Sequence, residues 1–138
     1  MKRRLLSAFL AVMMVLTMAP VAFAADEGDT LQSKINNASD KVTLTQNYTE
    51  DITIPAGKNI TLNLNGNTLT NKTGHTITVE QGATLTIEGN GTVDNVTNGK
   101  TTVYNKGTVA LKGGTYKRSA EDGVDANNAG LLYCAESW

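Results

Sequence analysis

The sequence predicts an all-β protein, a parallel β-helix (β-solenoid) of about three coils with a short capping helix at its N-terminal end. The first observation is a repeat. Gly57, Gly82 and Gly107 are spaced by 82 − 57 = 25 and 107 − 82 = 25 residues, and a short alternating pattern precedes and follows each glycine. A repeat of this period is typical of solenoids. The second is the alternation of aliphatic and polar residues from Val42 onward, which is the period of half-buried strands.

Residues 1–24 are expected to be a signal peptide. Residues 2–4 are basic, residues 5–18 are almost wholly apolar, and residues 22–24 read Ala-Phe-Ala, a small-x-small cleavage signal. The apolar stretch is shorter than the roughly 18 residues expected of a membrane span. The sequence therefore predicts a secreted or cell-surface protein that has no membrane association once the signal is cleaved.

Charge and cysteine content exclude two further classes. Removal of the signal leaves nine of the 12 basic residues and all 13 acidic ones, a formal net charge of 9 − 13 = −4. Nucleic-acid binding, which needs a basic face for phosphates, is not expected. Cys134 is the only cysteine, so the fold cannot depend on an intramolecular disulfide.

Residues 25–40 are predicted to form an N-terminal lead and a capping helix. Asp29 is a candidate N-cap with Gln32 three residues on, and Leu31, Ile35 and Ala38 recur at helical spacing. Such a short helix is marginal alone. We expect it to pack its apolar face over the open end of the solenoid, which would otherwise be an exposed edge.

Residues 41–118 are predicted to form the coils, with Gly57, Gly82 and Gly107 at equivalent corners. An antiparallel sandwich with Asn-Gly hairpins is the alternative, but it gives no reason for glycines to recur every 25 residues. The expected columns of stacked residues are Ile52, Ile77 and Thr102; Ile54, Val79 and Tyr104; Leu62, Leu85 and Val109; Leu64, Ile87 and Leu111; and Leu69, Val93 and Tyr116. Val103 is out of phase with Ile77 in this alignment, which leaves the register of the third coil open.

Residues 119–138 are predicted to be an irregular C-terminal tail. The alternation stops after Arg118, and residues 130–138 form an apolar and aromatic stretch unlike the coils. With no recognisable cap, the third coil would leave a strand edge exposed. We therefore expect the chain to be the N-terminal part of a longer β-helix protein, and we expect self-association through the exposed C-terminal coil.

Two phrases of the sequence resemble a known group of proteins. IPAGKNITLNLNGNTLTN (residues 54–71) and NKGTVALKGGTYKRS (residues 105–119) are similar to the right-handed parallel β-helix repeats of bacterial secreted and cell-surface proteins, the pectate-lyase-like superfamily. The resemblance implies a right-handed β-helix. It does not imply a function, because enzymes of this superfamily carry a row of acidic residues with a basic partner, and no positions here match that motif.

The chemically reactive residues do not form a recognisable site. Glu80, Glu88 and Asp94 could supply the paired carboxylates of a glycosidase, but no neighbouring coil repeats an acid at these positions, which favours solvated faces. His75, the only histidine, lies beside Gly74 without a candidate nucleophile and is interpreted as a turn residue. We predict no catalytic residues, no metal site and no cofactor.

The leading functional hypothesis is a non-catalytic β-solenoid module that serves adhesion, acts as a spacer or contacts carbohydrate. Its partner would be a polysaccharide or cell-surface glycan. Tyr48, Tyr104 and Tyr116 are the candidate ligand-stacking residues, although one tyrosine per coil can equally belong to the core. The alternative is an N-terminal fragment of a polysaccharide lyase or glycoside hydrolase of the β-helix class.

Overall fold

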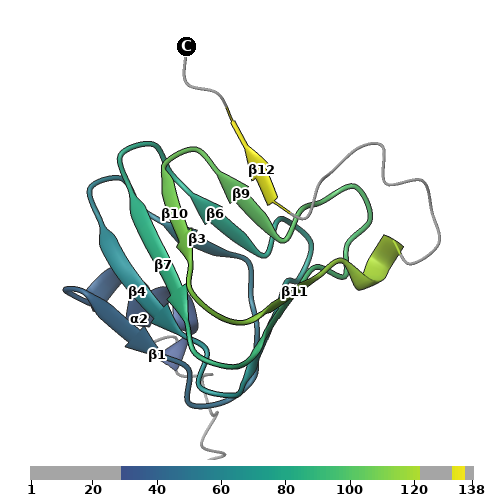
Figure 1. Cartoon of the computed structure of the whole chain (residues 1–138), viewed down its shortest axis with the longest axis horizontal. Helices are drawn as coiled ribbons and strands as arrows, with labels where there is room; N and C mark the ends of the chain where they lie inside the picture. The colour runs from purple at the N-terminus through teal and green to yellow at the C-terminus, as the bar shows by residue number, and fades with distance from the viewer. Residues whose placement is uncertain (1–28, 122–131, 136–138) are drawn as a thin grey trace, which may run out of the picture.

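The computed structural model describes residues 29–121 and 132–135 and shows a parallel β-solenoid of about three turns, which confirms the predicted fold class (Figure 1). Strands that are far apart in sequence lie side by side in three sheets, each of four parallel strands. The predicted signal peptide and residues 122–131 and 136–138 of the predicted tail lie outside the described residues. Within the described part of the chain, no helix has the length and apolar character needed to cross a membrane.

Each coil contributes one strand to each sheet. Sheet A consists of β1 (Lys41–Thr43), β4 (Asn59–Asn63), β7 (Thr84–Glu88) and β10 (Thr108–Leu111). Sheet B consists of β2 (Tyr48–Thr49), β5 (Thr68–Thr70), β8 (Thr92–Asp94) and β11 (Thr115–Lys117). Sheet C consists of β3 (Ile52–Ile54), β6 (Ile77–Val79), β9 (Val103–Asn105) and β12 (Leu132–Cys134). A short 3-10 helix, η3 (Ser119–Glu121), follows β11.

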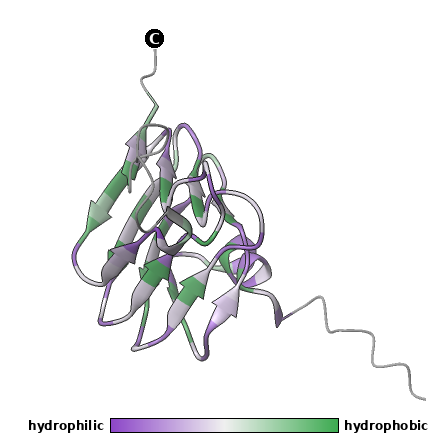
Figure 2. Ribbon diagram, turned by 90° about the vertical axis from the view of Figure 1, so that its right-hand side faces the viewer, coloured by the Kyte–Doolittle hydropathy of each residue, from purple (hydrophilic) through white to green (hydrophobic). Residues whose placement is uncertain are grey.

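The core lies between the three sheets and is made of stacked aliphatic side chains. Because successive residues of a strand point to opposite faces, alternate residues enter the core and the others face outward. Figure 2 shows the corresponding alternation of hydrophobic and hydrophilic residues along the strands. The columns Leu85–Val109, Ile87–Leu111 and Leu69–Val93–Tyr116 have the predicted register. So do the pairs Ile52–Ile77 and Ile54–Val79.

The predicted pairing of the first coil with the second in sheet A is wrong by two residues. Leu62 was expected opposite Leu85, but Ile60 pairs with Leu85 and Leu62 pairs with Ile87. Leu64 follows β4, and its N–H donates to the carbonyl of Glu88 at 3.0 Å instead of lying opposite Ile87. Paired residues of β4 and β7 are 25 positions apart in the sequence, like Gly57 and Gly82. The predicted columns paired residues only 23 positions apart.

The predicted register of the third coil in sheet C is wrong by one residue. Val103, not Thr102, pairs with Ile77, so Tyr104 lies opposite Thr78 on the outward face. The cause is a longer corner, because residues 95–102 separate β8 from β9 whereas only residues 71–76 separate β5 from β6. Thr102 is buried in this corner, and its hydroxyl donates to the carbonyl of Lys117.

The three repeat glycines do not all occupy one corner position. The Gly57 N–H donates to the Gly82 carbonyl at 3.1 Å, and both glycines have positive φ angles of 79° and 80°. Thr84 pairs with Asn59 across 25 residues but with Thr108 across only 24. The third glycine, Gly107, is therefore displaced by one position, and a Cβ there would lie 2.4 Å from the Ala83 carbonyl oxygen.

The N-terminal end of the solenoid is covered by α2 (Leu31–Asn37), as predicted. The N-cap is Thr30, whose hydroxyl accepts from the Ser33 N–H at 3.1 Å, instead of the expected Asp29. Leu31 and Ile35 are fully buried. The helix thus closes one end of the core with the two apolar residues that the helical spacing indicates.

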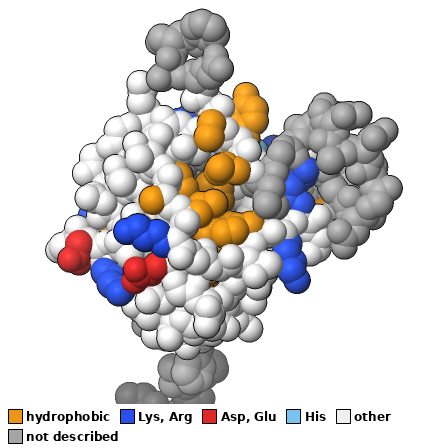
Figure 3. All heavy atoms as spheres, in the orientation of Figure 1, with side chains coloured by type: hydrophobic (Ala, Val, Ile, Leu, Met, Phe, Trp, Pro, Cys, Tyr) orange, Lys and Arg blue, Asp and Glu red, His pale blue; other side chains and the backbone are white. Residues whose placement is uncertain are grey.

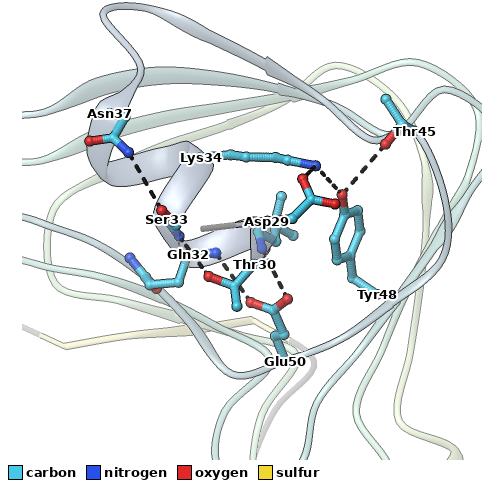
Figure 4. A network of polar contacts seen from close by, with 10 residues as sticks. Asp29, Thr30, Gln32, Ser33, Lys34, Asn37, Thr45, Tyr48 and Glu50 are labelled. Atoms are coloured by element: carbon cyan, nitrogen blue, oxygen red, sulfur yellow. Dashed lines mark hydrogen bonds and ion pairs between the residues drawn. The ribbon is translucent and has the colours of Figure 1, made fainter. Parts of the chain in front are cut away.

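Polar side chains attach α2 to the first coil (Figure 4). The Glu50 carboxylate accepts from the backbone N–H groups of Leu31 and Gln32 at 2.9 and 3.1 Å, where it also meets the positive end of the helix dipole. The Gln32 amide then pairs with the backbone of Thr53, accepting from its N–H at 2.7 Å and donating to its carbonyl at 2.9 Å. One glutamine side chain therefore satisfies the backbone of β3 in place of a neighbouring strand.

Candidate functional site

An aromatic column lies on the outward face of sheet C. The register places Thr53, Thr78, Tyr104 and Tyr133 opposite one another on successive strands. His75, which precedes β6, stacks on the Tyr104 ring with centroids 4.6 Å apart and an interplanar angle of 15°. Tyr104 stacks in turn on Tyr133 at 5.2 Å and 2°. We call His75, Tyr104 and Tyr133 the aromatic ladder.

The two tyrosines of the ladder differ in their exposure to solvent. Tyr104 stacks on both His75 and Tyr133 and is only partly exposed. Tyr133 also stacks on Tyr104 but is 47% exposed. Tyr133 is thus the most exposed residue of the ladder.

A lysine and an acid flank the ladder. Lys106 Nζ lies 5.6 Å from the centroid of the Tyr104 ring, within the range of a cation–π contact. The same ammonium group is 3.0 Å from Glu80 Oε2. Because both partners are more than a third exposed, this ion pair contributes little to stability. It does fix a donor and an acceptor beside the aromatic rings.

His75 is held in a neutral form. Its Nδ1 atom accepts from the Thr101 N–H at 3.0 Å, which requires that nitrogen to be unprotonated. Partial burial, followed by the nearby charge of Lys100, lowers the pKa of the imidazole below its usual value. His75 lies at a corner, as its interpretation as a turn residue implies. That interpretation did not include its stacking on Tyr104.

Tyr48 and Tyr116, the other two candidate stacking residues, lie elsewhere. Tyr48 is 5% exposed, and its hydroxyl accepts from Lys34 Nζ at 2.7 Å (Figure 4). Tyr116 packs half-buried against the core and donates to the Gly113 carbonyl at 2.8 Å. Burial raises the pKa of Tyr116 to about 12. Of the three candidates, only Tyr104 has its ring on an outward face.

The carboxylates are used to fasten corners and neighbouring strands. Asp51 accepts hydrogen bonds from the backbone N–H groups of residues 72–74 and thereby holds the corner of the next coil. Glu88 is 2.8 Å from Lys41 Nζ on the outer face of sheet A. Asp94 accepts from both the N–H and the hydroxyl of Ser119. Glu88 and Asp94 are two of the three acids considered as glycosidase candidates, and the third, Glu80, is paired with Lys106.

Comparisons with known proteins add no family. In the described residues no group of three or more His, Cys, Asp or Glu side chains is placed to hold a metal ion. No family model, curated relative or solved structure matches this chain.

Proposed function

We propose that this protein is a secreted or cell-surface, non-catalytic β-solenoid module that contacts polysaccharide or cell-surface glycan through the outward face of sheet C. The observation that carries the proposal is the 47% exposure of Tyr133, which stacks on Tyr104 at the end of the aromatic ladder. A tyrosine ring combines a flat apolar surface with a polar hydroxyl. A pyranose ring can continue the stack over Tyr133 with its apolar C–H face.

Rows of polar side chains on the other two faces support the proposal. Thr68, Thr92 and Thr115 are in register on sheet B, and Asn59, Thr84 and Thr108 are in register on sheet A. Neighbouring strands lie about 4.8 Å apart, so each row is a regular line of hydrogen-bonding groups. Hydroxyl and amide groups both donate and accept, which suits the hydroxyls of a sugar chain.

The finer parts of the proposal have separate support. Right-handed coiling is favoured because nearly all connections between parallel strands of one sheet are right-handed. A distant relationship to the pectate-lyase-like β-helix proteins of bacteria is favoured by the phrases at residues 54–71 and 105–119. Export is favoured by the signal-peptide pattern of residues 1–24.

Affinity electrophoresis in gels containing polygalacturonate, xylan or galactan tests the proposal. We expect at least one polysaccharide to retard the purified protein, and Tyr133→Ala to weaken that retardation about tenfold, the effect of roughly 1.4 kcal/mol. Tyr116→Phe is the matched control, because it keeps an aromatic ring and lies off sheet C. Migration unaffected by every polysaccharide, or equal retardation of Tyr133→Ala, would overturn the proposal. Release of unsaturated sugars would instead favour the lyase alternative.

A further inference from the structure

His75 joins two successive corners of the solenoid. It lies in the corner between β5 and β6, and its Nδ1 atom accepts from the N–H of Thr101, in the corner between β8 and β9, at 3.0 Å. The two residues are 26 positions apart in the sequence. Thr101 is 1% exposed. The backbone of a buried residue thus depends on one imidazole nitrogen of the preceding coil.

The other bonds to the backbone of Thr101 come from groups that do not titrate. The Thr101 carbonyl accepts from the Thr76 N–H at 3.2 Å and from the Asn95 side-chain amide at 3.1 Å. The same Asn95 amide donates to the Gly74 carbonyl at 3.0 Å. Thr76 and Asn95 are both buried. Of these contacts between the two corners, the one made by His75 is the one that a change of pH can remove.

Protonation of the imidazole removes this bond outright. A neutral imidazole has one N–H donor and one acceptor nitrogen, whereas both nitrogens carry protons in the imidazolium form. A protonated Nδ1 would direct its own N–H at the N–H of Thr101. A half-turn of the ring restores no acceptor, because neither nitrogen keeps a free lone pair. The bond to Thr101 therefore exists only while His75 is neutral.

The charged and titratable groups around the ring come from three parts of the chain. Tyr104 of β9 stacks on the imidazole with centroids 4.6 Å apart. Lys100, in the corner before β9, and Lys106, which follows β9, oppose protonation, whereas Asp51, which directly precedes β3, favours it. Partial burial, followed by the charge of Lys100, lowers the pKa of His75 from its usual value of 6.5.

We propose that His75 is a pH switch, which fastens the corner at residues 95–102 to the preceding coil at neutral pH and releases it in mild acid. The stability that neutral His75 contributes is complete above the unfolded pKa of 6.5 and is lost as the pH falls through the lower pKa of the folded state. The released corner leads directly into β9, which carries Tyr104. This inference does not depend on glycan binding at sheet C.

An NMR titration of the purified protein tests the switch directly. His75 is the only histidine, so the imidazole signal gives its pKa without assignment to a particular residue. We expect a pKa below 6.5, and we expect the amide signal of Thr101 to shift with the same midpoint while that of Leu85, in the core of β7, does not. A pKa of 6.5 or higher, or a Thr101 amide signal that does not follow the imidazole, would overturn the proposal.

Two variants separate titration of the ring from its stacking. In His75→Asn the amide oxygen stands as many bonds from Cβ as Nδ1 does and can accept from Thr101, but it does not titrate. In His75→Phe an aromatic ring remains for Tyr104, but the acceptor is lost at every pH.

Thermal unfolding between about pH 7.5 and about pH 5.5, above the usual titration of carboxylates, compares the three proteins. The melting temperature of the parent should fall across this range more than that of either variant. At the upper pH, His75→Phe should melt below His75→Asn. A parent that loses no more than His75→Asn would overturn the proposal, and the NMR titration of the parent decides it where a variant does not fold.

Discussion

Two leucines in the same column test whether the C-terminal end of the core is open, because truncation of each should lower the free energy of unfolding by a different amount. Figure 3 shows hydrophobic side chains gathered in the middle of the face that this end presents. Leu62 and Leu111 flank Ile87 in the core, but Leu62 is fully buried and Leu111 is 43% exposed. Leu62→Ala should cost about 3–5 kcal/mol, because it removes buried methyl groups and leaves an enclosed cavity. Leu111→Ala should cost about 1 kcal/mol, because roughly half of the 1.5–3 kcal/mol for burying a leucine is realised there and no enclosed cavity forms.

Urea unfolding followed by far-ultraviolet circular dichroism measures both costs. The two variants change the same side chain in the same way, so the difference of at least about 2 kcal/mol isolates the effect of position in the stack. The slope of the transition should be the same for both variants and the parent, which shows that the unfolded states are comparable. Equal losses for the two substitutions would refute the reasoning, because they would mean that Leu111 is enclosed in solution.

Three other perturbations have defined outcomes. Gln32→Ala should leave the backbone of Thr53 without its amide partner. We expect the free energy of unfolding to fall by about 1–3 kcal/mol and hydrogen exchange at Thr53 to become faster. An unchanged exchange rate would contradict the capping role of Gln32. Asp51 has a lowered pKa because its bonds to backbone N–H groups outweigh burial, which by itself raises the pKa. The ionised Asp51 therefore contributes its full share of the stability of the fold above the pKa of an unfolded aspartate, and this share is lost as the pH falls through the lower pKa of the folded state. In a plot of melting temperature against pH, Asp51→Asn should show a smaller loss of stability on the acid side than the parent. Parallel curves for the two proteins would exclude this role. Gly107→Ala should destabilise more than Gly82→Ala, since a Cβ at Gly107 meets the backbone at 2.4 Å whereas Gly82 has only the roughly 1 kcal/mol cost of a positive φ angle; the reverse order in thermal unfolding would contradict the observed register.

The parts of the fold that local sequence determines were predictable. Leu31 and Ile35 lie on one face of the helix, and alternate residues of each strand lie on one face of the sheet. In both cases the apolar face packs on the same core, so the spacing in the sequence indicates the element. The glycine repeat then indicates that the strands stack in parallel. Helix, strands and architecture therefore follow from patterns within a few residues and from one long-range period.

The register of the third coil and the aromatic ladder depend on corner length, which the alternation does not specify. The corner before β9 is two residues longer than the corner before β6, and this places Val103 inward and Tyr104 outward. A one-residue change of register exchanges the two faces of a strand. His75 and Tyr133 were not recognised as ladder residues for the same reason, although the choice of Val103 as the inward residue would have placed Tyr104 beside them.

The hydrogen bonds between Gln32 and Thr53 also bear on the order in which the coils fold, because they close the end of the solenoid that is synthesised first. Ribosomes produce the capped end first, so the helix and first coil are available before any later strand exists. We expect each completed coil to offer its free edge as the template for the next one, so that nearest-neighbour contacts extend the fold toward the C-terminus. At every stage only the newest coil has an exposed edge, which limits the surface through which a partly made chain can aggregate.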